Sequence, residues 1–157
     1  MPTRPLLLAL VICVLAAGFE GLMAGAGVKQ RFAELRMPPG SPNLPVWIAI
    51  GGLYYAMCFV VLYRLFAGGM TTADADVAFV LAIAVMIYNG AWSALFFRLK
   101  NLKVAFLSFI PYAALILALA IELARIDEWS AAAVAPYLAY LIYATWWGFR
   151  IWQLNKS

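Results

Sequence analysis

Residues 104–123 read VAFLSFIPYAALILALAIEL, a run of 20 residues in which Glu122 is the only charged side chain. As an α-helix, such a run rises about 30 Å, which matches the hydrocarbon core of a lipid bilayer. A strand of a membrane barrel would be about half as long and would alternate apolar with polar residues. This run does not alternate, so it predicts a transmembrane helix.

Four further apolar segments of similar length complete the chain, and together the five segments predict one domain of 157 residues. Apolar residues make up 67% of the sequence and charged residues 11%. This composition excludes a soluble globular protein, because such proteins average about 25% charged residues. The predicted fold class is an all-α membrane protein, a bundle of five transmembrane helices. The helices are expected at about residues 5–28, 45–66, 74–97, 104–123 and 130–151, and the longest loop at residues 29–44.

Lysine and arginine residues are distributed unevenly between the two sides that five membrane crossings would create. The side of the N-terminus would hold three of them, Arg4, Arg64 and Arg125. The opposite side would hold eight, namely Lys29, Arg31, Arg36, Arg98, Lys100, Lys103, Arg150 and Lys156. Cytoplasmic loops of membrane proteins are enriched in Lys and Arg. We therefore expect an integral, multi-pass protein whose N-terminus lies outside and whose first loop and C-terminus lie in the cytoplasm.

The chain contains no histidine, which excludes His-ligated haem, His-containing zinc sites and the Ser-His or Cys-His pairs of nucleophilic enzymes. Cys13 and Cys58 each lie in an apolar segment and lack the spacing of a metal site. No run of Lys or Arg is long enough to bind nucleic acid. We therefore expect no metal site, no nucleic-acid partner and no required cofactor.

Glu20 is the most unusual polar residue, because it lies deep in the first segment with apolar residues or glycine on both sides. Ionisable side chains within a membrane are costly and are often functional. Two interpretations remain open. A protonated Glu20 carboxyl would bond to a neighbouring helix, or the side chain would serve as a proton site or contact a ligand.

Three of the predicted helices carry aromatic side chains at spacings that place them on one helical face. These stripes consist of Tyr54, Met57 and Val61 in the second helix, of Asn89, Trp92, Ser93 and Phe96 in the third, and of Tyr137, Tyr140, Ala144 and Trp147 in the fifth. A single stripe of this kind is typical of helix packing. Three stripes that converge inside one bundle would instead line a pocket for a flat, apolar ligand.

Short motifs follow one another along the chain in a characteristic order. They are Leu53–Met57 (LYYAM), Asn89–Phe97 (NGAWSALFF), Pro136–Leu138 (PYL) and Trp152–Asn155 (WQLN). The ordered set resembles the translocator protein family, which is also called TspO/MBR, tryptophan-rich sensory protein or peripheral benzodiazepine receptor. The resemblance covers nearly the whole chain.

This resemblance implies a five-helix membrane bundle of TspO/MBR type, commonly a homodimer in contact with membrane lipid. It also implies binding of tetrapyrroles such as protoporphyrin IX, of sterol-like lipids and of benzodiazepine-type ligands, in a pocket among the helices beneath the first loop. A metal-free porphyrin suits a chain without histidine better than haem does. The expected ligand-binding residues are Trp47, Tyr54, Met57, Asn89, Trp92, Phe96, Tyr137, Tyr140, Ala144 and Trp147.

The chain departs from the family pattern at three positions. Ile50 and Tyr140 stand where tryptophans are expected, and Gly148 stands where an asparagine is expected. Bacterial members have been linked to light-dependent breakdown of porphyrin with tryptophans at the first two places, so the departures disfavour an enzyme. The predicted function is a binding or sensory membrane protein for a planar hydrophobic ligand. The alternatives are a transporter of tetrapyrroles or lipids, a light-dependent porphyrin-degrading enzyme and an assembly subunit of a larger membrane complex.

Overall fold

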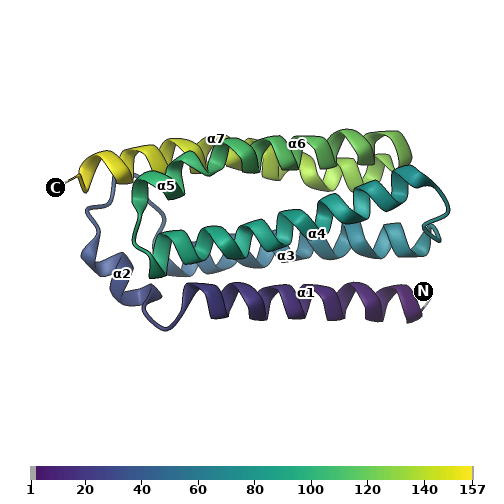
Figure 1. Ribbon diagram of the computed structural model, residues 1–157, viewed down its shortest axis with the longest axis horizontal. Helices are drawn as coiled ribbons and strands as arrows, with labels where there is room; N and C mark the ends of the chain where they lie inside the picture. The colour runs from purple at the N-terminus through teal and green to yellow at the C-terminus, as the bar shows by residue number, and fades with distance from the viewer. Residues whose placement is uncertain (1–2, 157) are drawn as a thin grey trace.

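The computed structural model describes residues 3–156, and helices account for nearly all of this range (Figure 1). Five long helices run side by side, and three shorter ones lie at their ends. The elements are α1 (Thr3–Ala24), α2 (Val28–Glu34), α3 (Leu44–Ala67), α4 (Ala73–Ser93), the π-helical turn η1 (Ala94–Arg98), α5 (Leu102–Leu107), α6 (Phe109–Ile126) and α7 (Glu128–Leu154). Residues 3–156 contain no β-strand, so the all-α prediction is confirmed.

Two of the predicted boundaries near the first loop are wrong. The first helix, expected at residues 5–28, ends at Ala24, because Gly25 turns the chain with a φ of +73° that suits glycine. The chain then forms α2, so the predicted loop 29–44 is helical in its first part. The sequence offered only a weak signal for this short helix, since its seven residues span two turns.

The fourth predicted helix, residues 104–123, consists of two helices. α5 ends at Leu107 and α6 begins at Phe109. Pro111 lacks the N–H group that would bond to the carbonyl of Leu107, so one hydrogen bond of the helical ladder is missing at this break. If η1 is counted with α4, the ends of the other three helices lie within three residues of their predicted positions.

Three of the long helices begin at residues whose side chains cap them. Asn43, Thr72 and Asp127 each accept a hydrogen bond from the backbone N–H three residues further along, at the starts of α3, α4 and α7. Such caps satisfy one of the N–H groups that a helix start leaves without a partner. The local sequence therefore sets where these helices begin.

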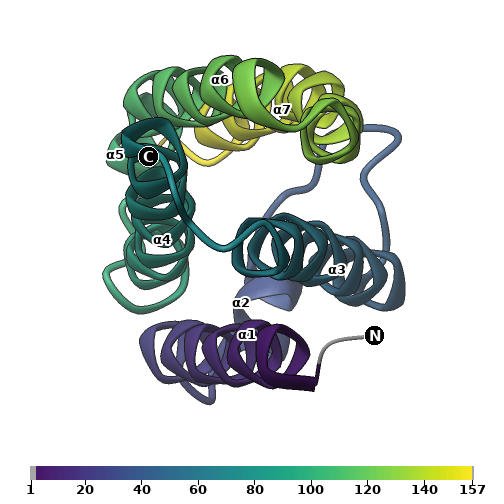
Figure 2. The same cartoon turned by 90° about the vertical axis from the view of Figure 1, so that its right-hand side faces the viewer.

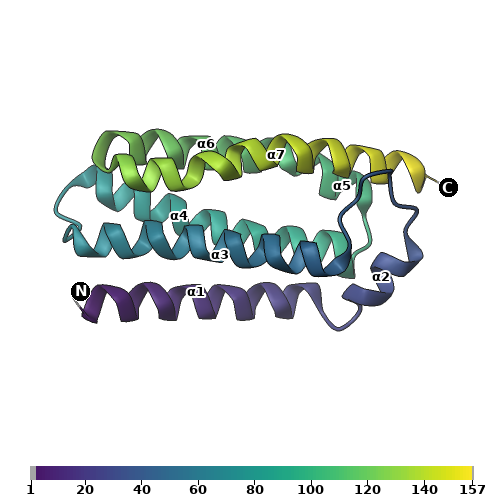
Figure 3. The ribbon, with the colours of Figure 1, turned by 180° about the vertical axis from the view of Figure 1, so that it is seen from behind.

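Four helical spans within residues 3–156 are long and apolar enough to cross a membrane. They are Thr3–Ala24, Leu44–Ala67, Ala73–Arg98 and Leu102–Ile126. Together they make the chain an integral, multi-pass membrane protein. α7 is 27 residues long and packs beside the others, but it is less apolar, so the count of five membrane crossings stays a prediction. The two ends of the described chain lie at opposite ends of the bundle, as five antiparallel helices require (Figures 1 and 3).

Viewed end-on, α3, α4, α6 and α7 surround a central region, and α1 lies outside against α3 and α4 (Figure 2). α4 packs on α6, α6 on α7, and α7 returns to α3. Leu62, Ile116 and Val134 are completely buried between these helices. Large apolar side chains such as Leu15, Leu22 and Ile142 are instead exposed on the outer surface. In water such a surface would be unfavourable, whereas lipid tails would cover it.

Candidate functional site

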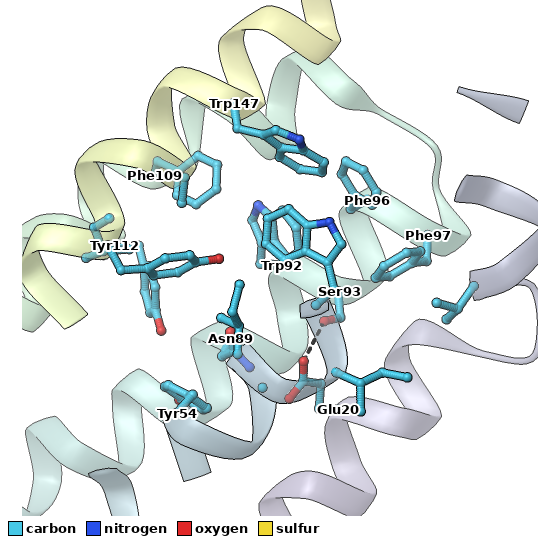
Figure 4. Close-up of a pocket in the computed structure, with 18 of the residues that line it drawn as sticks. Glu20, Tyr54, Asn89, Trp92, Ser93, Phe96, Phe97, Phe109, Tyr112 and Trp147 are labelled. Atoms are coloured by element: carbon cyan, nitrogen blue, oxygen red, sulfur yellow. Dashed lines mark hydrogen bonds between the residues drawn. The ribbon is translucent and has the colours of Figure 1, made fainter. Parts of the chain in front are cut away.

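A cavity of about 280 Å³ lies inside the bundle toward the end that carries α2 and the first loop (Figure 4). α1, α2, α3, α4, η1, α6 and α7 all contribute to its wall. Its aromatic residues are Phe32, Trp47, Tyr54, Trp92, Phe96, Phe97, Phe109, Tyr112, Tyr137, Tyr140 and Trp147. The cavity is therefore lined mainly by flat aromatic rings.

The stripe predicted on α4 does face the cavity, because Asn89, Trp92, Ser93 and Phe96 all line it. The Trp92 indole N–H donates to the carbonyl of Ala105 at 3.1 Å, which fixes the ring. Its ring stacks on that of Phe96, with centroids 5.1 Å apart and an angle of 17° between the planes. Trp92 thus presents a flat and well-oriented surface to the cavity.

The end of α4 changes its winding where it reaches the cavity. Residues Ala94–Arg98 form the π-helical turn η1, in which the Leu99 N–H bonds to the carbonyl of Ala94, five residues back. The wider turn brings the neighbouring rings of Phe96 and Phe97 both into the wall. π-helical turns often occur at functional sites.

Trp147 of α7 closes the wall beneath the first loop. Its side chain is only 2% exposed, and its indole N–H donates to the Ser41 hydroxyl at 3.0 Å. The ring centroids of Trp47 and Trp147 lie 4.7 Å apart, and Phe96 stacks against the same indole at 5.7 Å. The three rings form a continuous aromatic face at this end of the cavity.

The deeper part of the wall carries hydroxyl groups. The Tyr112 and Tyr137 hydroxyls lie 3.0 Å apart and form a hydrogen bond. Tyr54 is 4% exposed, and its hydroxyl has no hydrogen-bond partner within residues 3–156. In Figure 4, Tyr54, Asn89 and Tyr112 lie on the side of the cavity away from Trp147. The cavity thus has an aromatic end and an end with polar groups.

Glu20 reaches the wall from α1. Its carboxylate accepts hydrogen bonds from the Tyr55 hydroxyl of α3 at 2.7 Å and the Ser93 hydroxyl of α4 at 3.1 Å, the second of which is drawn in Figure 4. Both contacts join α1 to the rest of the bundle. Glu20 is thus bonded to two neighbouring helices and also forms part of the cavity wall, so both interpretations of this residue stay predictions.

The first loop covers the end of the cavity and is attached at several points. The Tyr143 hydroxyl donates to the carbonyl of Gly40 at 3.3 Å. The Asn155 side chain accepts from the N–H of Arg36 at 3.0 Å and donates to the carbonyl of Arg36 at 3.1 Å. Together with the Ser41 contact of Trp147, these bonds attach the loop to α7.

α2 is held to the turn that follows η1. The Lys100 ammonium bonds to the Glu34 carboxylate at 3.0 Å, and this contact lowers the pKa of Glu34. The Arg31 guanidinium donates to the carbonyl of Lys100 at 3.3 Å. The covering segment is therefore joined to the bundle on both sides of the cavity.

Nine of the ten residues expected to bind ligand lie in the cavity wall. These are Trp47, Tyr54, Asn89, Trp92, Phe96, Tyr137, Tyr140, Ala144 and Trp147. Met57 does not, because it lies almost one turn further along α3, where it is buried in the core. Of the three departures from the family pattern, Ile50 and Tyr140 line the cavity and Gly148 does not.

Several wall residues were absent from the sequence prediction. Phe109 and Tyr112 lie three residues apart in α6, so the same helical spacing argument would have found them. Phe32 lies in the short helix α2, and no periodic pattern identifies it. Gly148 has an indirect role, since a Cβ atom there would lie 2.8 Å from the ring of Phe109.

Comparisons with known proteins identify the family. The TspO/MBR family model matches residues 9–153. The translocator protein of Ovis aries is 29% identical over 148 residues, which cover 89% of this chain and 84% of the relative. The tryptophan-rich protein TspO of Chlorobaculum tepidum is 24% identical over 154 residues, which cover 95% and 97%. The protein described above belongs to the TspO/MBR family.

Proposed function

We propose that this protein is a binding or sensory membrane protein that holds a planar hydrophobic ligand in the aromatic cavity, with a metal-free tetrapyrrole as the first candidate. The observation that carries the proposal is the stacked aromatic face of Trp92, Phe96 and Trp147 in the wall of the cavity. Flat rings gain most from such a surface, because aromatic side chains bury a large apolar area with a defined geometry. Sterol-like lipids are further candidates, because they are also flat and apolar.

The chemistry of the wall favours a ligand without a metal centre. The lining residues include no histidine, cysteine or methionine, so among the usual axial ligands of a haem iron only tyrosine is present. The volume of about 280 Å³ lies just below the range of about 300–1,000 Å³ that is typical of small-molecule sites. A four-ring ligand would therefore extend out of the cavity or require part of its wall to move as it binds.

Transport of the ligand is a second candidate function. The two relatives described above are called translocator protein and tryptophan-rich protein TspO. Ile48 lines the cavity and is 67% exposed on the surface that lipid would cover. An apolar ligand would thus pass between the bilayer and the cavity on this side of α3. Ile50 and Tyr140, which replace tryptophans, continue to disfavour a porphyrin-degrading enzyme.

The orientation and the assembly of the protein are also proposals. The positive-inside count places the N-terminus outside and the first loop in the cytoplasm. Apolar side chains on the outer surface allow contact with lipid and with a second copy of the chain, so a homodimer is proposed. Labelling of single cysteines from each side of the membrane would test the orientation, and chemical cross-linking in liposomes would test the dimer.

A titration tests the proposed function directly. Purified protein in detergent is mixed with protoporphyrin IX while tryptophan fluorescence is followed, and the complex is then illuminated. We expect saturable quenching and a porphyrin spectrum that stays stable in light. Unsaturable quenching would contradict the tetrapyrrole proposal, and light-dependent loss of the bound spectrum would favour the enzyme instead. Uptake of porphyrin into protein-containing liposomes would separate transport from binding.

A further inference from the structure

The two ends of the bundle differ in charge. Among residues 3–156, the α2 end carries eight Lys or Arg side chains and, outside the cavity, the single carboxylate of Glu34, whereas the far end carries three Lys or Arg and five carboxylates. Glu34 pairs with Lys100 at 3.0 Å and with Arg31 at 3.9 Å. The other cations of the α2 end form no ion pair within residues 3–156, namely Lys29, Arg36, Arg98, Lys103, Arg150 and Lys156.

Two of these cations lie beside a pair of aromatic rings that joins α5 to the last turns of α7. The Phe106 and Trp152 rings stack with their centroids 5.7 Å apart and an angle of 14° between the planes, and both side chains are partly exposed. The Lys156 ammonium lies 4.4 Å from the centroid of the Trp152 ring. Lys103 precedes Phe106 by three residues, so the two side chains share a face of α5.

The direction of the two helices places both lysines on the same side of the rings. α5 leads from the end of the bundle inward, and α7 leads outward to that end (Figure 1). Lys103 and Lys156 are therefore each about one turn nearer the end than the ring beside them. On the inner side, Leu107 and Ile110 are 44% and 67% exposed. Cations above apolar side chains match the two parts of a phospholipid, its phosphate and its acyl chains.

The charges around the rings restrict which headgroup fits. No Asp or Glu occurs in residues 99–121 or 129–156, so neither helix offers a carboxylate near the rings to a cationic headgroup. The Trp152 ring could otherwise attract a choline or an ethanolamine, but Lys156 already lies over it. Two neighbouring ammonium groups repel each other, and an anion bound beside both would offset this repulsion. A headgroup with net negative charge is therefore favoured over a zwitterionic one.

We propose that Lys103, Lys156 and the Phe106–Trp152 pair form a binding site for an anionic phospholipid, such as phosphatidylglycerol. The two ammonium groups hold the phosphate, and the rings support the upper part of the acyl chains. Basic side chains next to a membrane-spanning helix commonly attract anionic lipids. None of these four residues lines the aromatic cavity, so the site is separate from it and does not depend on the function proposed for it.

The experiment measures tryptophan quenching by lipids that carry bromine in their acyl chains. The protein is placed in phosphatidylcholine liposomes that contain the same small fraction of either brominated phosphatidylglycerol or brominated phosphatidylcholine. The excess of quenching by the anionic lipid over the zwitterionic lipid measures selective binding close to a tryptophan. Each value is normalised to the same variant in liposomes without bromine.

The test variant is the double substitution Lys103→Gln and Lys156→Gln. The matched control is Lys29→Gln with Arg98→Gln, which removes the same charge at the same end of the bundle. Lys29 lies in α2, and the Arg98 side chain lies beside Gly25 of the α1–α2 turn. Figure 1 shows α2 and α5 on opposite sides of this end of the bundle. Lys103→Arg with Lys156→Arg keeps the charge at the site, and Trp152→Phe keeps a ring there but removes the tryptophan that reports on it.

We expect the wild type, the control and the arginine variant to show an excess, and the test variant to show about one fifth of it or less, as the loss of cations near an anionic lipid predicts. Trp152→Phe should remove most of the excess. The excess should also fall as the ionic strength rises from about 0.01 M to about 0.15 M, because screening weakens attraction between exposed charges. Quenching by brominated phosphatidylcholine should be equal in the four proteins that retain Trp152, which would show that they are inserted alike.

Three results would overturn the proposal. The first is a wild type without any excess, since no anionic lipid would then be selected. The second is an equal loss in the test variant and in the control, which would mean that the charge of the whole end attracts anionic lipid and that no particular site exists. The third is an excess that persists in Trp152→Phe, because the selected lipid would then lie beside another tryptophan.

Discussion

The two ends of the bundle each contain a hollow, and the larger of them is the weaker candidate for a ligand site. The hollow at the far end has a volume of about 770 Å³ and lies between the α3–α4 and α6–α7 turns. Charged and hydroxyl-bearing residues, among them Arg64, Thr72, Arg125 and Asp127, contribute to its wall. The aromatic cavity at the α2 end holds about 280 Å³. Volume alone therefore does not identify the site.

The two hollows differ in whether the polar groups in their walls have hydrogen-bond partners. At the far end the Arg64 guanidinium forms two hydrogen bonds with the Asp127 carboxylate, at 2.5 and 2.6 Å. Asp127 also accepts a bond from the backbone N–H of Ser130. These contacts are internal and join α3 to the start of α7. At the α2 end the buried polar atoms of Tyr54 and Trp47 have no partner within residues 3–156. Buried polar atoms without a hydrogen-bond partner therefore indicate a ligand site better than the volume of a hollow does.

Among substitutions that test this difference between the two ends, Trp92→Ala should change ligand affinity most. Removing the stacked indole should weaken protoporphyrin IX binding about tenfold or more, because a buried aromatic surface contributes a few kcal/mol. Trp129→Ala is the matched control, since Trp129 is 67% exposed at the far end. Affinities are measured by fluorescence quenching. An unchanged affinity in Trp92→Ala would assign this residue to helix packing alone.

A smaller effect is expected from Gly148→Ala. The added Cβ would lie 2.8 Å from the Phe109 ring, so the ring must move toward the cavity that it lines. We expect porphyrin affinity to fall about fivefold and the free energy of unfolding to fall by about 1–3 kcal/mol. Gly18→Ala in α1 is the control, because a Cβ there meets no atom within 4 Å. Equal affinities in the two variants would show that Phe109 does not shape the site.

A weaker effect is expected from Asn155→Ala, which removes two hydrogen bonds to the backbone of Arg36. The first loop should detach more often, and the dissociation rate of the ligand should rise about threefold, since exposed hydrogen bonds contribute little each. Stopped-flow displacement measures this rate. Gln153→Ala is a suitable comparison, because its side-chain contact is with Arg150 on the same helix. A rate equal to that of the wild type would mean that the loop does not limit release.

Arg64→Met at the far end is expected to leave ligand binding unchanged. The free energy of unfolding should fall by about 1 kcal/mol at pH 7, a value reduced by the partial exposure of the pair. The Arg64 guanidinium, together with hydrogen bonds from Ser130, lowers the pKa of Asp127 from 3.8 to about 2. A lowered carboxyl pKa stabilises the fold above about pH 4, and this stabilisation is lost as the pH falls through about 2.

The stability difference between the wild type and Arg64→Met should therefore shrink between about pH 4 and pH 2. Thermal unfolding in detergent at several pH values measures it. A constant difference over this range would contradict the role given to the ion pair. A change in porphyrin affinity would contradict the separation of the two ends.

Most of the fold could be predicted from local patterns in the sequence. Apolar runs as long as residues 104–123 must be helical in a bilayer, because no water is present to satisfy an open backbone. Caps at Asn43, Thr72 and Asp127 set three of the helix starts. Three features escaped this reasoning, namely the short helix α2, the π-helical turn η1 and the break before Pro111. None of the three is encoded in a repeating apolar pattern.

The residue types, their order and their spacing along the helices were sufficient to predict nine wall residues and the resemblance to a family. The α1 contacts of Glu20, the place of Phe32 and the position of Met57 outside the wall depended on how the helices pack. The lack of a hydrogen-bond partner for the Tyr54 hydroxyl likewise depends on how the helices pack. Helical periodicity assigns a side chain to a face of its own helix, whereas only the packing of several helices determines which faces meet and which donors remain free.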